Sequence, residues 1–342
     1  KVKLYRVSWS KKLMTIDKKY IDSFINVASN AALSSYFLVG KKDKIAADQA
    51  AVDSMRTELN KIDMCGEIVI GEGELDEAPM LYIGEKLGTM KGPNLDIAVD
   101  PLEGTNFAAN NLPGALSVIA VSEKSNLFNA PETYMNKIAV GKVEKGVVDL
   151  DFELKKNISN LADYKNKDIS SLTACILDRP RHKKIIDELK ELKVKLKLIT
   201  DGDISGALLV TNTVHNIDIF LGIGGGPEGV LAASALDAYD CFFQGRFLFE
   251  NENDINRANK MGIQDLNKKY EINEIVSGDS IFCAAGITSG DLVNGVKIYN
   301  NKYICEILVT HKNSGLKEVV KKSGMVSQKL IDLHNLIDWH KD

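Results

Sequence analysis

The chain has 342 residues and a formal net charge of −4 at pH 7. This length predicts two domains, and a composition of 44% hydrophobic and 26% charged residues is that of an ordinary globular protein. The charge gives no basic field for nucleic acid, and no apolar run approaches the ~20 residues that span a bilayer. We therefore expect neither a nucleic-acid nor a membrane partner, and an anionic ligand has to be met by local cations or bound metal.

The cysteines are scattered singly and form no CxxC pair: Cys65, Cys175, Cys241, Cys283 and Cys305. This pattern is neither a disulfide framework nor a thiolate zinc site, and it favours the reducing cytoplasm. The chain has five histidines and no HExxH motif. Any metal is therefore expected to be held by oxygen ligands.

The first residues, KVKLYRVSWSKKLMTI, are basic and contain no acidic residue. Such a composition is compatible with a transit peptide, but no apolar signal core follows it. We interpret residues 1–13 as an extension upstream of a start at Met14, outside the fold.

Hydrophobic periodicity predicts the elements in chain order. The first half is predicted to contain helices over 17–40, 45–61 and 76–88, strands over 67–71, 96–100 and 115–123, and a hairpin over 137–151. The second half is predicted to alternate strands with helices, over 173–178, 181–193, 195–200, 203–213, 216–224 and 227–240. Alternation of this kind is typical of layered α/β domains. The polar segment 157–170 is predicted to be a loop at a domain boundary, and 315–342 a terminal helix.

Carboxylates follow two of the predicted strands. EIVIG ends before a loop that carries Glu72, Glu74, Asp76 and Glu77, and DIAVD ends in Asp100. If the two strands are neighbours, Glu72, Asp100 and Glu103 converge at one sheet edge, where α/β folds place ligand sites. Converging carboxylates repel each other and call for a hard divalent cation, whereas an acidic loop alone is more often a solvated turn.

The segment DPLEGT contains the densest chemistry of the chain. Pro101 is expected to force a turn, so that the Leu102 carbonyl and the Glu103 carboxylate point inward. Gly104 leaves room for a phosphate, and Thr105 places a hydroxyl beside the metal. The segment therefore predicts a site that holds two metal ions and aims a water molecule at a phosphoryl group.

A glycine-rich run from Gly224 to Gly229 matches the dinucleotide motif GxGxxG. Glu228 would put a negative charge where a pyrophosphate sits, and no acidic residue closes a second strand about twenty residues on. We expect the glycines to form a tight strand-to-helix turn. Glu228 then either reaches the metal site or caps the helix.

Cationic and polar residues follow other predicted elements. Lys44 lies at a helix start near Asp48. Arg179 and Arg181 follow a strand, where two guanidinium groups offer a phosphate site, although arginine is common at helix starts. The sequence DGD at 201–203 follows the next strand and either accepts hydrogen bonds from sugar hydroxyls or forms an ordinary turn and cap.

These motifs together resemble a known family. VDPLEGT resembles the DPxDGT/S signature of the lithium-sensitive, metal-dependent sugar-phosphate phosphatases, with Glu103 where many members have aspartate. DKIAADQAAVDSMR, GEGELDEAPMLYIGE, NAPETYMNK, GIGGGPEG and GITSGDL resemble class II fructose-1,6-bisphosphatase, in the expected order over about residues 16–300. The resemblance implies an α-β-α-β-α sandwich of two α/β domains. We expect a metal-binding catalytic domain at 14–165 and a sugar-phosphate-binding domain at 166–342.

The resemblance also implies roles for individual residues. The metal ligands it implies, together with the Leu102 carbonyl inferred above, are Asp48, Glu72, Asp100, Glu103 and Glu228. The catalytic residue is Thr105, with Asp48 or Asp76 behind it and Lys44 nearby. The implied substrate contacts are Glu103, Gly104, Thr105, Tyr134, Arg179, Pro180, Arg181, Asp201, Gly202, Asp203 and Gly225. The family has an arginine after the motif threonine, whereas this chain has Asn106, which would lower the affinity for phosphate.

The expected reaction is hydrolysis of fructose 1,6-bisphosphate in gluconeogenesis, with two or more Mn2+ or Mg2+ ions per active site. The expected partner is a small sugar bisphosphate, and the expected assembly is a homo-oligomer, either dimer or tetramer. Two related activities stay open, on sedoheptulose 1,7-bisphosphate and on an inositol phosphate. So do a non-catalytic sugar-phosphate or dinucleotide-binding protein and an oxidoreductase that uses the glycine-rich run.

Overall fold

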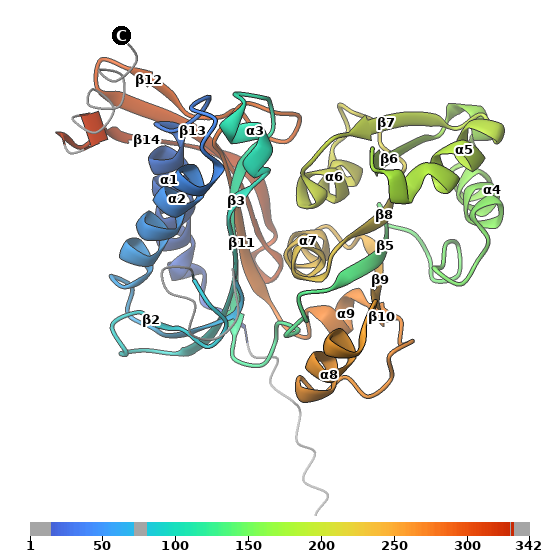
Figure 1. Ribbon diagram of the computed structural model, residues 1–342, viewed down its shortest axis with the longest axis horizontal. Coiled ribbons are helices and arrows are strands. Elements are labelled where there is room, and N and C mark those ends of the chain that lie inside the picture. Colours follow the sequence, from blue (N-terminus) through green and yellow to red (C-terminus); the bar gives the residue numbers. More distant parts are fainter. Residues whose placement is uncertain (1–14, 72–80, 329, 332–342) are drawn as a thin grey trace, which may run out of the picture.

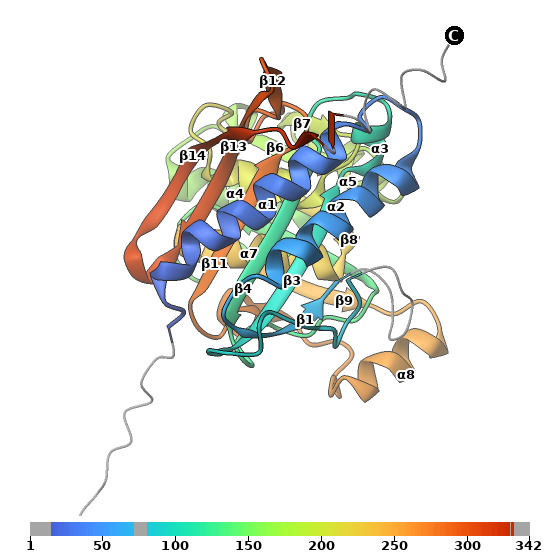
Figure 2. The same cartoon turned by 90° about the vertical axis from the view of Figure 1, so that its left-hand side faces the viewer.

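The computed structural model describes residues 15–71, 81–328 and 330–331 (Figure 1). Helices α1 (Ile21–Tyr36) and α2 (Lys44–Leu59) cover one face of a large sheet, as Figure 2 shows from the side. Helices α6 (Asp203–Leu208) and α7 (Gly226–Ala238) lie between this sheet and a smaller one (Figure 1). Helices α4 (Leu154–Lys165) and α5 (Lys183–Glu191) cover the far side of the smaller sheet. The predicted α-β-α-β-α sandwich is confirmed.

The larger sheet has eight strands over the described residues, in the order β12-β13-β11-β4-β3-β1-β2, with β14 paired to β13. Its strands are β1 (Cys65–Ile70), β2 (Lys86–Leu87), β3 (Asn94–Glu103), β4 (Leu116–Glu123), β11 (Ser280–Gly286), β12 (Lys297–Tyr299), β13 (Lys302–His311) and β14 (Leu316–Met325). Its central strands are buried on both faces because helices cover both. In β3, Ile97 and Val99 pack in the core beneath α1 and α2, whereas Ala98 faces the core around α7.

The smaller sheet has six strands among the described residues, in the order β10-β9-β5-β8-β6-β7. They are β5 (Tyr134–Val140), β6 (Thr173–Leu177), β7 (Lys195–Ile199), β8 (Ile219–Gly225), β9 (Phe242–Leu248) and β10 (Tyr270–Glu271). Three short helices complete the described fold: α3 (Thr105–Ala109), α8 (Glu252–Lys260) and α9 (Ile272–Ile275). None of the helices within the described residues is long and apolar enough to cross a membrane.

The chain enters the smaller sheet after β4 and returns to the larger one at β11. The C-terminal strands therefore lie in the same sheet as β1, β3 and β4. The division into domains at residue 165 stays a prediction. The loop predicted for 157–170 is wrong over 157–165, because α4 covers these residues and buries Ile158 and Leu161 against the smaller sheet.

Two predicted elements are wrong because their strands pair with remote partners. The hairpin predicted for 137–151 does not form; β5 is instead a central strand that pairs with β8 and β9. The terminal helix predicted for 315–342 is wrong over 316–325, which form strand β14 (Leu316–Met325) and pair with β13 along its whole length, whereas residues 328, 330 and 331 are helical. Residues 332–342 lie outside the described residues.

The helix predicted for 76–88 is also wrong over its described part. Residues 76–80 lie outside the described residues, and 81–88 form turns and the short strand β2. Gly84 and Gly88 have φ values of 95° and 99°, which a helix does not allow. The 3.6-residue spacing of apolar residues was therefore not a helical signal in this segment.

Candidate active site

The site begins where two neighbouring strands of the larger sheet end. β1 and β3 pair in parallel, with Ile68 opposite Ile97, so the predicted neighbourhood of the two strands is confirmed. Gly71, directly after β1, and Asp100, near the end of β3, line the same cavity. Glu72, Glu74, Asp76 and Glu77 lie outside the described residues.

A β-bulge brings two acids to the cavity. In the ladder between β3 and β4, Asp100 lies opposite Val118 and Glu103 opposite Leu116, so β3 contains one extra residue. Without it, side chains three positions apart would point to opposite faces of the sheet. Pro101 has no N–H to contribute and lies in the bulge, so the turn predicted there is wrong. The strand continues through the proline, and both carboxylates line the cavity.

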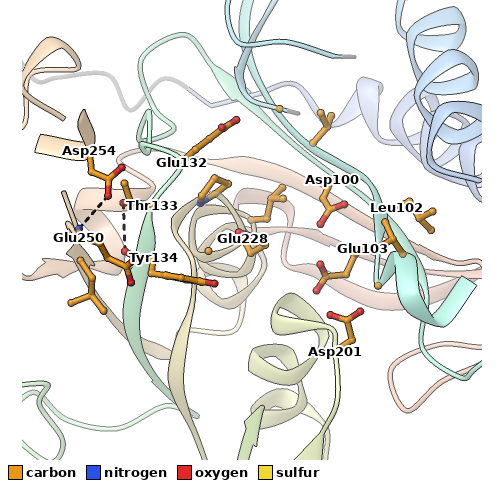
Figure 3. Close-up of a pocket in the computed structure, with 18 of the residues that line it drawn as sticks. Asp100, Leu102, Glu103, Glu132, Thr133, Tyr134, Asp201, Glu228, Glu250 and Asp254 are labelled. Atoms are coloured by element: carbon orange, nitrogen blue, oxygen red, sulfur yellow. Dashed lines mark hydrogen bonds between the residues drawn. The ribbon is translucent and has the colours of Figure 1, made fainter. Parts of the chain in front are cut away.

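The cavity has a volume of about 630 Å³ and is lined mainly by acidic and backbone groups (Figure 3). Its carboxylates are Asp100, Glu103, Glu132, Asp201, Glu228, Glu250 and Asp254. Figure 3 shows Asp100 and Glu103 on one side of the cavity and Asp201 pointing toward them from the other. No described residue that lines the cavity is basic. The carboxylates that line this cavity therefore need a positively charged ligand.

The buried acids of the site resist ionisation. Burial, together with the nearby charges of Glu228 and Asp203, raises the pKa of Glu103 to about 7. A hydrogen bond between the side chains of Asp100 and Glu103 and a second one from the Ile204 N–H act in the opposite direction. Burial also raises the pKa of Glu228. Burial is the largest cause of both pKa shifts and nearby like charges add to it, so a bound cation would oppose them.

Gly104 allows the chain to turn from β3 into α3. Its φ of 78° is a left-handed conformation, and a Cβ there would lie 2.9 Å from Cδ2 of Phe107. The residue that follows, Thr105, is the first of α3 and lines the cavity beside Glu103. The structure therefore brings Thr105 to the same cavity as Asp100 and Glu103, and its position beside a metal stays a prediction.

The glycine-rich run joins β8 directly to α7, as expected. The strand ends at Gly225 and the helix starts at Gly226, so no separate loop intervenes. A Cβ on Gly225 would lie 1.8 Å from Oε2 of Glu228, and one on Gly226 would lie 2.7 Å from Phe247. Glycine therefore lets the Glu228 carboxylate fold back over the junction. Glu228 lines the cavity, as do Gly225 and Pro227.

The two predicted arginines lie beside cavity residues of the smaller sheet. Arg179 pairs with Asp201 at 3.6 Å. Arg181 lies over the ring of Tyr134, with its guanidinium carbon 4.9 Å from the ring centre, and its Nε donates to the Ile223 carbonyl at 2.8 Å. Pro180 lies between them and begins a short 3-10 turn.

The DGD segment contacts the acidic wall of the larger sheet. Gly202 has a φ of 84° and precedes Asp203, which is buried. The next N–H, of Ile204, donates to Oε1 of Glu103 at 2.9 Å. The two sheets therefore meet at the site, and this backbone hydrogen bond helps to fix the Glu103 carboxylate.

Some predicted residues are not brought to the cavity wall. Lys44 and Asp48 lie on α2, which packs against β3 and α3, and neither is among the described residues that line the cavity. Within the described residues, no three His, Cys, Asp or Glu side chains are grouped closely enough to hold a metal ion as they stand. The predicted ligand Glu72 lies outside the described ranges.

Sequence reasoning missed five polar lining residues: Glu132, Thr133, Glu250, Asn251 and Asp254. The first two lie inside the motif NAPETYMNK, of which only Tyr134 was predicted to contact the substrate. The other three lie at the start of α8, where no element was predicted, and the Asn251 side chain caps this helix by accepting from the Asp254 N–H. No local signal distinguished them.

Comparison with known proteins gives the family. The model described as "Bacterial fructose-1,6-bisphosphatase, glpX-encoded" matches residues 18–323. A D-fructose 1,6-bisphosphatase class 2/sedoheptulose 1,7-bisphosphatase of Prochlorococcus marinus (strain MIT 9515) is 43% identical over 296 residues, 82% of this chain and 89% of that protein. Its namesake from strain MIT 9312 is 42% identical over the same shares. A solved inositol monophosphatase from Anabaena covers 55% of this chain and 69% of that one, at 16% identity and a TM-score of 0.27, a likeness too slight to bear on function. From the family match and these relatives, this chain belongs to the glpX-encoded bacterial fructose-1,6-bisphosphatases.

Proposed function

We propose that this protein hydrolyses the 1-phosphate of fructose 1,6-bisphosphate in a metal-dependent reaction, giving fructose 6-phosphate and inorganic phosphate. One observation carries the proposal beyond the family match: seven carboxylates line the cavity, and no described lining residue is basic. A phosphate dianion is repelled by such a wall unless cations lie between them. The site therefore suits a phosphorylated substrate only together with bound metal.

The donor set fits a hard divalent cation, because all its side-chain donors are carboxylate oxygens in one cavity. Asp100, Glu103 and Glu228 would hold Mn2+ or Mg2+. The same proposed set includes Asp48, Glu72 and the Leu102 carbonyl. When bound, such ions neutralise charge on the phosphate and lower the pKa of a bound water.

The chain's own groups then orient the reactants. The Thr105 hydroxyl hydrogen-bonds the attacking water and aligns it with the phosphorus, and Asp48 or Asp76 receives its proton. Lys44 lies on the same helix as Asp48, one turn before it. We assign no covalent phospho-threonine, because an aligned water suffices for in-line displacement.

The smaller sheet holds the sugar in this proposal. Arg179, Pro180 and Arg181 meet the 6-phosphate, and Tyr134 supports the second guanidinium by stacking. The DGD segment, with Gly202 at its turn, accepts hydrogen bonds from sugar hydroxyls. Gly225 lets the substrate approach the backbone, and Glu103 and Gly104 meet the phosphate that is removed.

The test is phosphate release from fructose 1,6-bisphosphate in EDTA, in Mg2+ and in Mn2+. We expect release only with metal, and its loss in Asp100→Asn. Asp187→Asn, which changes a half-exposed carboxylate paired with Lys183 on α5, is the matched control and should behave as wild type. Wild-type protein that releases no phosphate with either metal would refute the proposal.

The relatives' name also includes sedoheptulose 1,7-bisphosphatase, so that sugar belongs in the assay beside an inositol phosphate. A substrate preferred by a higher kcat/KM identifies the main activity. The dinucleotide alternative predicts binding of NAD(H), which the Glu228 charge at the start of α7 opposes. The homo-oligomeric state and the cytoplasmic location stay predictions.

A further inference from the structure

A lysine occupies a core position beside the site. Lys137 lies in the middle of β5 and is only 1% exposed. Its neighbours on the same face of the strand, Met135 and Ala139, belong to the apolar core around α7. A buried ammonium group is costly unless it is paired and hydrogen-bonded. A buried lysine at this position therefore requires an ion-pair partner and hydrogen bonds, and its role needs an explanation.

Glycines lie next to Lys137 on three elements. Its Cα partners on the two adjacent strands are Gly222 of β8 and Gly245 of β9. A Cβ at Gly222 would meet the His182 ring, 3.1 Å from Nε2, and one at Gly245 would meet Sδ of Met135 at 2.4 Å. On α7, a Cβ at Gly229 would lie 3.6 Å from Cδ of Lys137, so the lysine side chain runs past the start of α7 at a position without a side chain.

The ammonium group joins two segments of the proposed sugar site. Nζ donates to the Gly225 carbonyl at 2.6 Å, at the end of β8. It also forms an ion pair with Oδ2 of Asp203, the first residue of α6. Among the described residues, the other carboxylate oxygen of Asp203, Oδ1, is buried and has no hydrogen-bond partner. One oxygen is thus fixed by the lysine, and the second is left as an acceptor.

We propose that Lys137 is a positioning residue for sugar recognition. By fixing Oδ2 of Asp203 and the Gly225 carbonyl, it holds α6 and the β8–α7 junction in register, so that the DGD segment and Gly225 keep their places at the sugar site. Of the three residues in this contact, only Gly225 is among the described residues that line the cavity, so Lys137 acts through its neighbours and not on the substrate itself. This inference rests on the proposed function, in which the substrate is a sugar bisphosphate.

The test compares two substrates in Lys137→Met. With fructose 1,6-bisphosphate we expect KM to rise about 10- to 100-fold, the loss typical of a hydrogen bond to a charged group, with kcat changed much less. With p-nitrophenyl phosphate, which has no sugar hydroxyl, kcat/KM should stay within about threefold of wild type. Asp203→Asn should show the same split between the two substrates.

A double variant separates loss of the contact from misfolding caused by an unpaired buried charge. Lys137→Met alone leaves the Asp203 charge buried without its partner, whereas Lys137→Met/Asp203→Asn removes both charges. Because the two residues act through one contact, the double variant should raise KM no further than the worse single variant. A KM effect equal to the product of the single effects would overturn the proposed coupling.

The matched control is Lys312→Met, which removes another ion pair to a poorly exposed aspartate, with Nζ 2.7 Å from Asp237 near the far end of α7. It should leave KM unchanged. A wild-type KM in Lys137→Met, or equal losses on both substrates, would overturn the inference alone. Absence of phosphate release by wild-type protein would instead refute the proposed function, and with it this inference.

Discussion

At the scale of the residue, Thr105 provides the sharpest test of the proposed chemistry. Its hydroxyl lies beside the acids of β3 and is not one of the proposed metal ligands. We expect Thr105→Ala to lower kcat by about 100-fold or more, because the variant loses the hydroxyl that hydrogen-bonds the attacking water during proton transfer. The metal concentration for half-maximal activity should not move.

The control for this change is Thr105→Ser, which retains the hydroxyl and should keep most of the turnover. Steady-state phosphate release across a metal titration measures both quantities. A normal kcat in the alanine variant would remove Thr105 from the mechanism, and a shifted metal dependence would make it a ligand instead.

His182 predicts how stability depends on pH. It is buried, its Nδ1 contacts the Leu177 carbonyl at 2.7 Å, and its Nε2 accepts from the Ile223 N–H at 2.7 Å. Burial first, and the charge of Arg181 next, lower its pKa, while the Leu177 carbonyl and Asp203 act in the opposite direction. A ring that accepts at Nε2 must be neutral, because protonation would set N–H against N–H.

The sign follows from this depressed pKa. Below about pH 6.5 the unfolded protein binds a proton at His182, whereas the folded protein keeps the ring neutral to a lower pH. The stabilisation is therefore complete above about pH 6.5 and is lost as the pH falls from there through the lower folded pKa. His182→Gln retains a donor and an acceptor but does not titrate. We expect urea unfolding to show a larger loss of stability for wild type than for the variant between about pH 7.5 and pH 5. Parallel pH profiles would contradict the assignment.

At the scale of the element, the junction of β8 and α7 couples backbone shape to the position of Glu228. Gly225 has φ −62° and ψ 144°, which alanine adopts readily, so backbone strain is not the issue. What matters is the clash of a Cβ with the Glu228 carboxylate, because this clash displaces a flexible side chain that we propose binds metal. Gly225→Ala should therefore weaken metal binding while costing little stability.

The measurement is the Mn2+ concentration that gives half-maximal activity, beside a thermal melt in EDTA. Gly141→Ala is the matched control, since its Cβ would meet nothing closer than 3.8 Å. We expect a shift of about tenfold or more in the metal titration for Gly225→Ala only. Equal shifts in both variants would mean that the junction tolerates a side chain.

Elements whose signals are local could be predicted from the sequence, and those set by remote pairing could not. The long helices α1 and α2 bury one continuous face, and β3 alternates between two cores, so periodicity identified them. β14 contains no buried residue and exists because β13 pairs with it. The same distinction holds at the site. DPLEGT and GGGPEG are contiguous and could be recognised, whereas Glu250 and Asp254 reach the cavity only through the fold.

At the scale of the whole molecule, the cavity lies where the two sheets face each other, and its acids come from both. Asp100 and Glu103 end a strand of the larger sheet, and Asp201 follows a strand of the smaller one. In the absence of cations, these charges repel one another across the cavity, and burial first, with the charges of Glu228 and Asp203 next, raises the pKa of Glu103 there. Metal should consequently act as a ligand of the folded state as a whole.

Thermal melts can test this coupling in wild type and Asp100→Asn. Wild type should be stabilised by Mn2+, by about 2.7 kcal/mol when free metal is 100-fold above its dissociation constant. Asp100→Asn removes one repelling charge and one ligand, so in EDTA it should melt at or above the wild-type temperature, and in Mn2+ below it.

Two controls accompany these melts. NaCl at equal ionic strength separates metal binding from screening of charge, and Asp187→Asn should follow wild type in every buffer. Because simple loss of packing would lower both melting temperatures of the variant, only this reversal of order between the two buffers supports a metal site that joins the two sheets. If Asp100→Asn melted below wild type by the same amount with and without metal, Asp100 would be a structural residue and the acidic cavity would need another explanation.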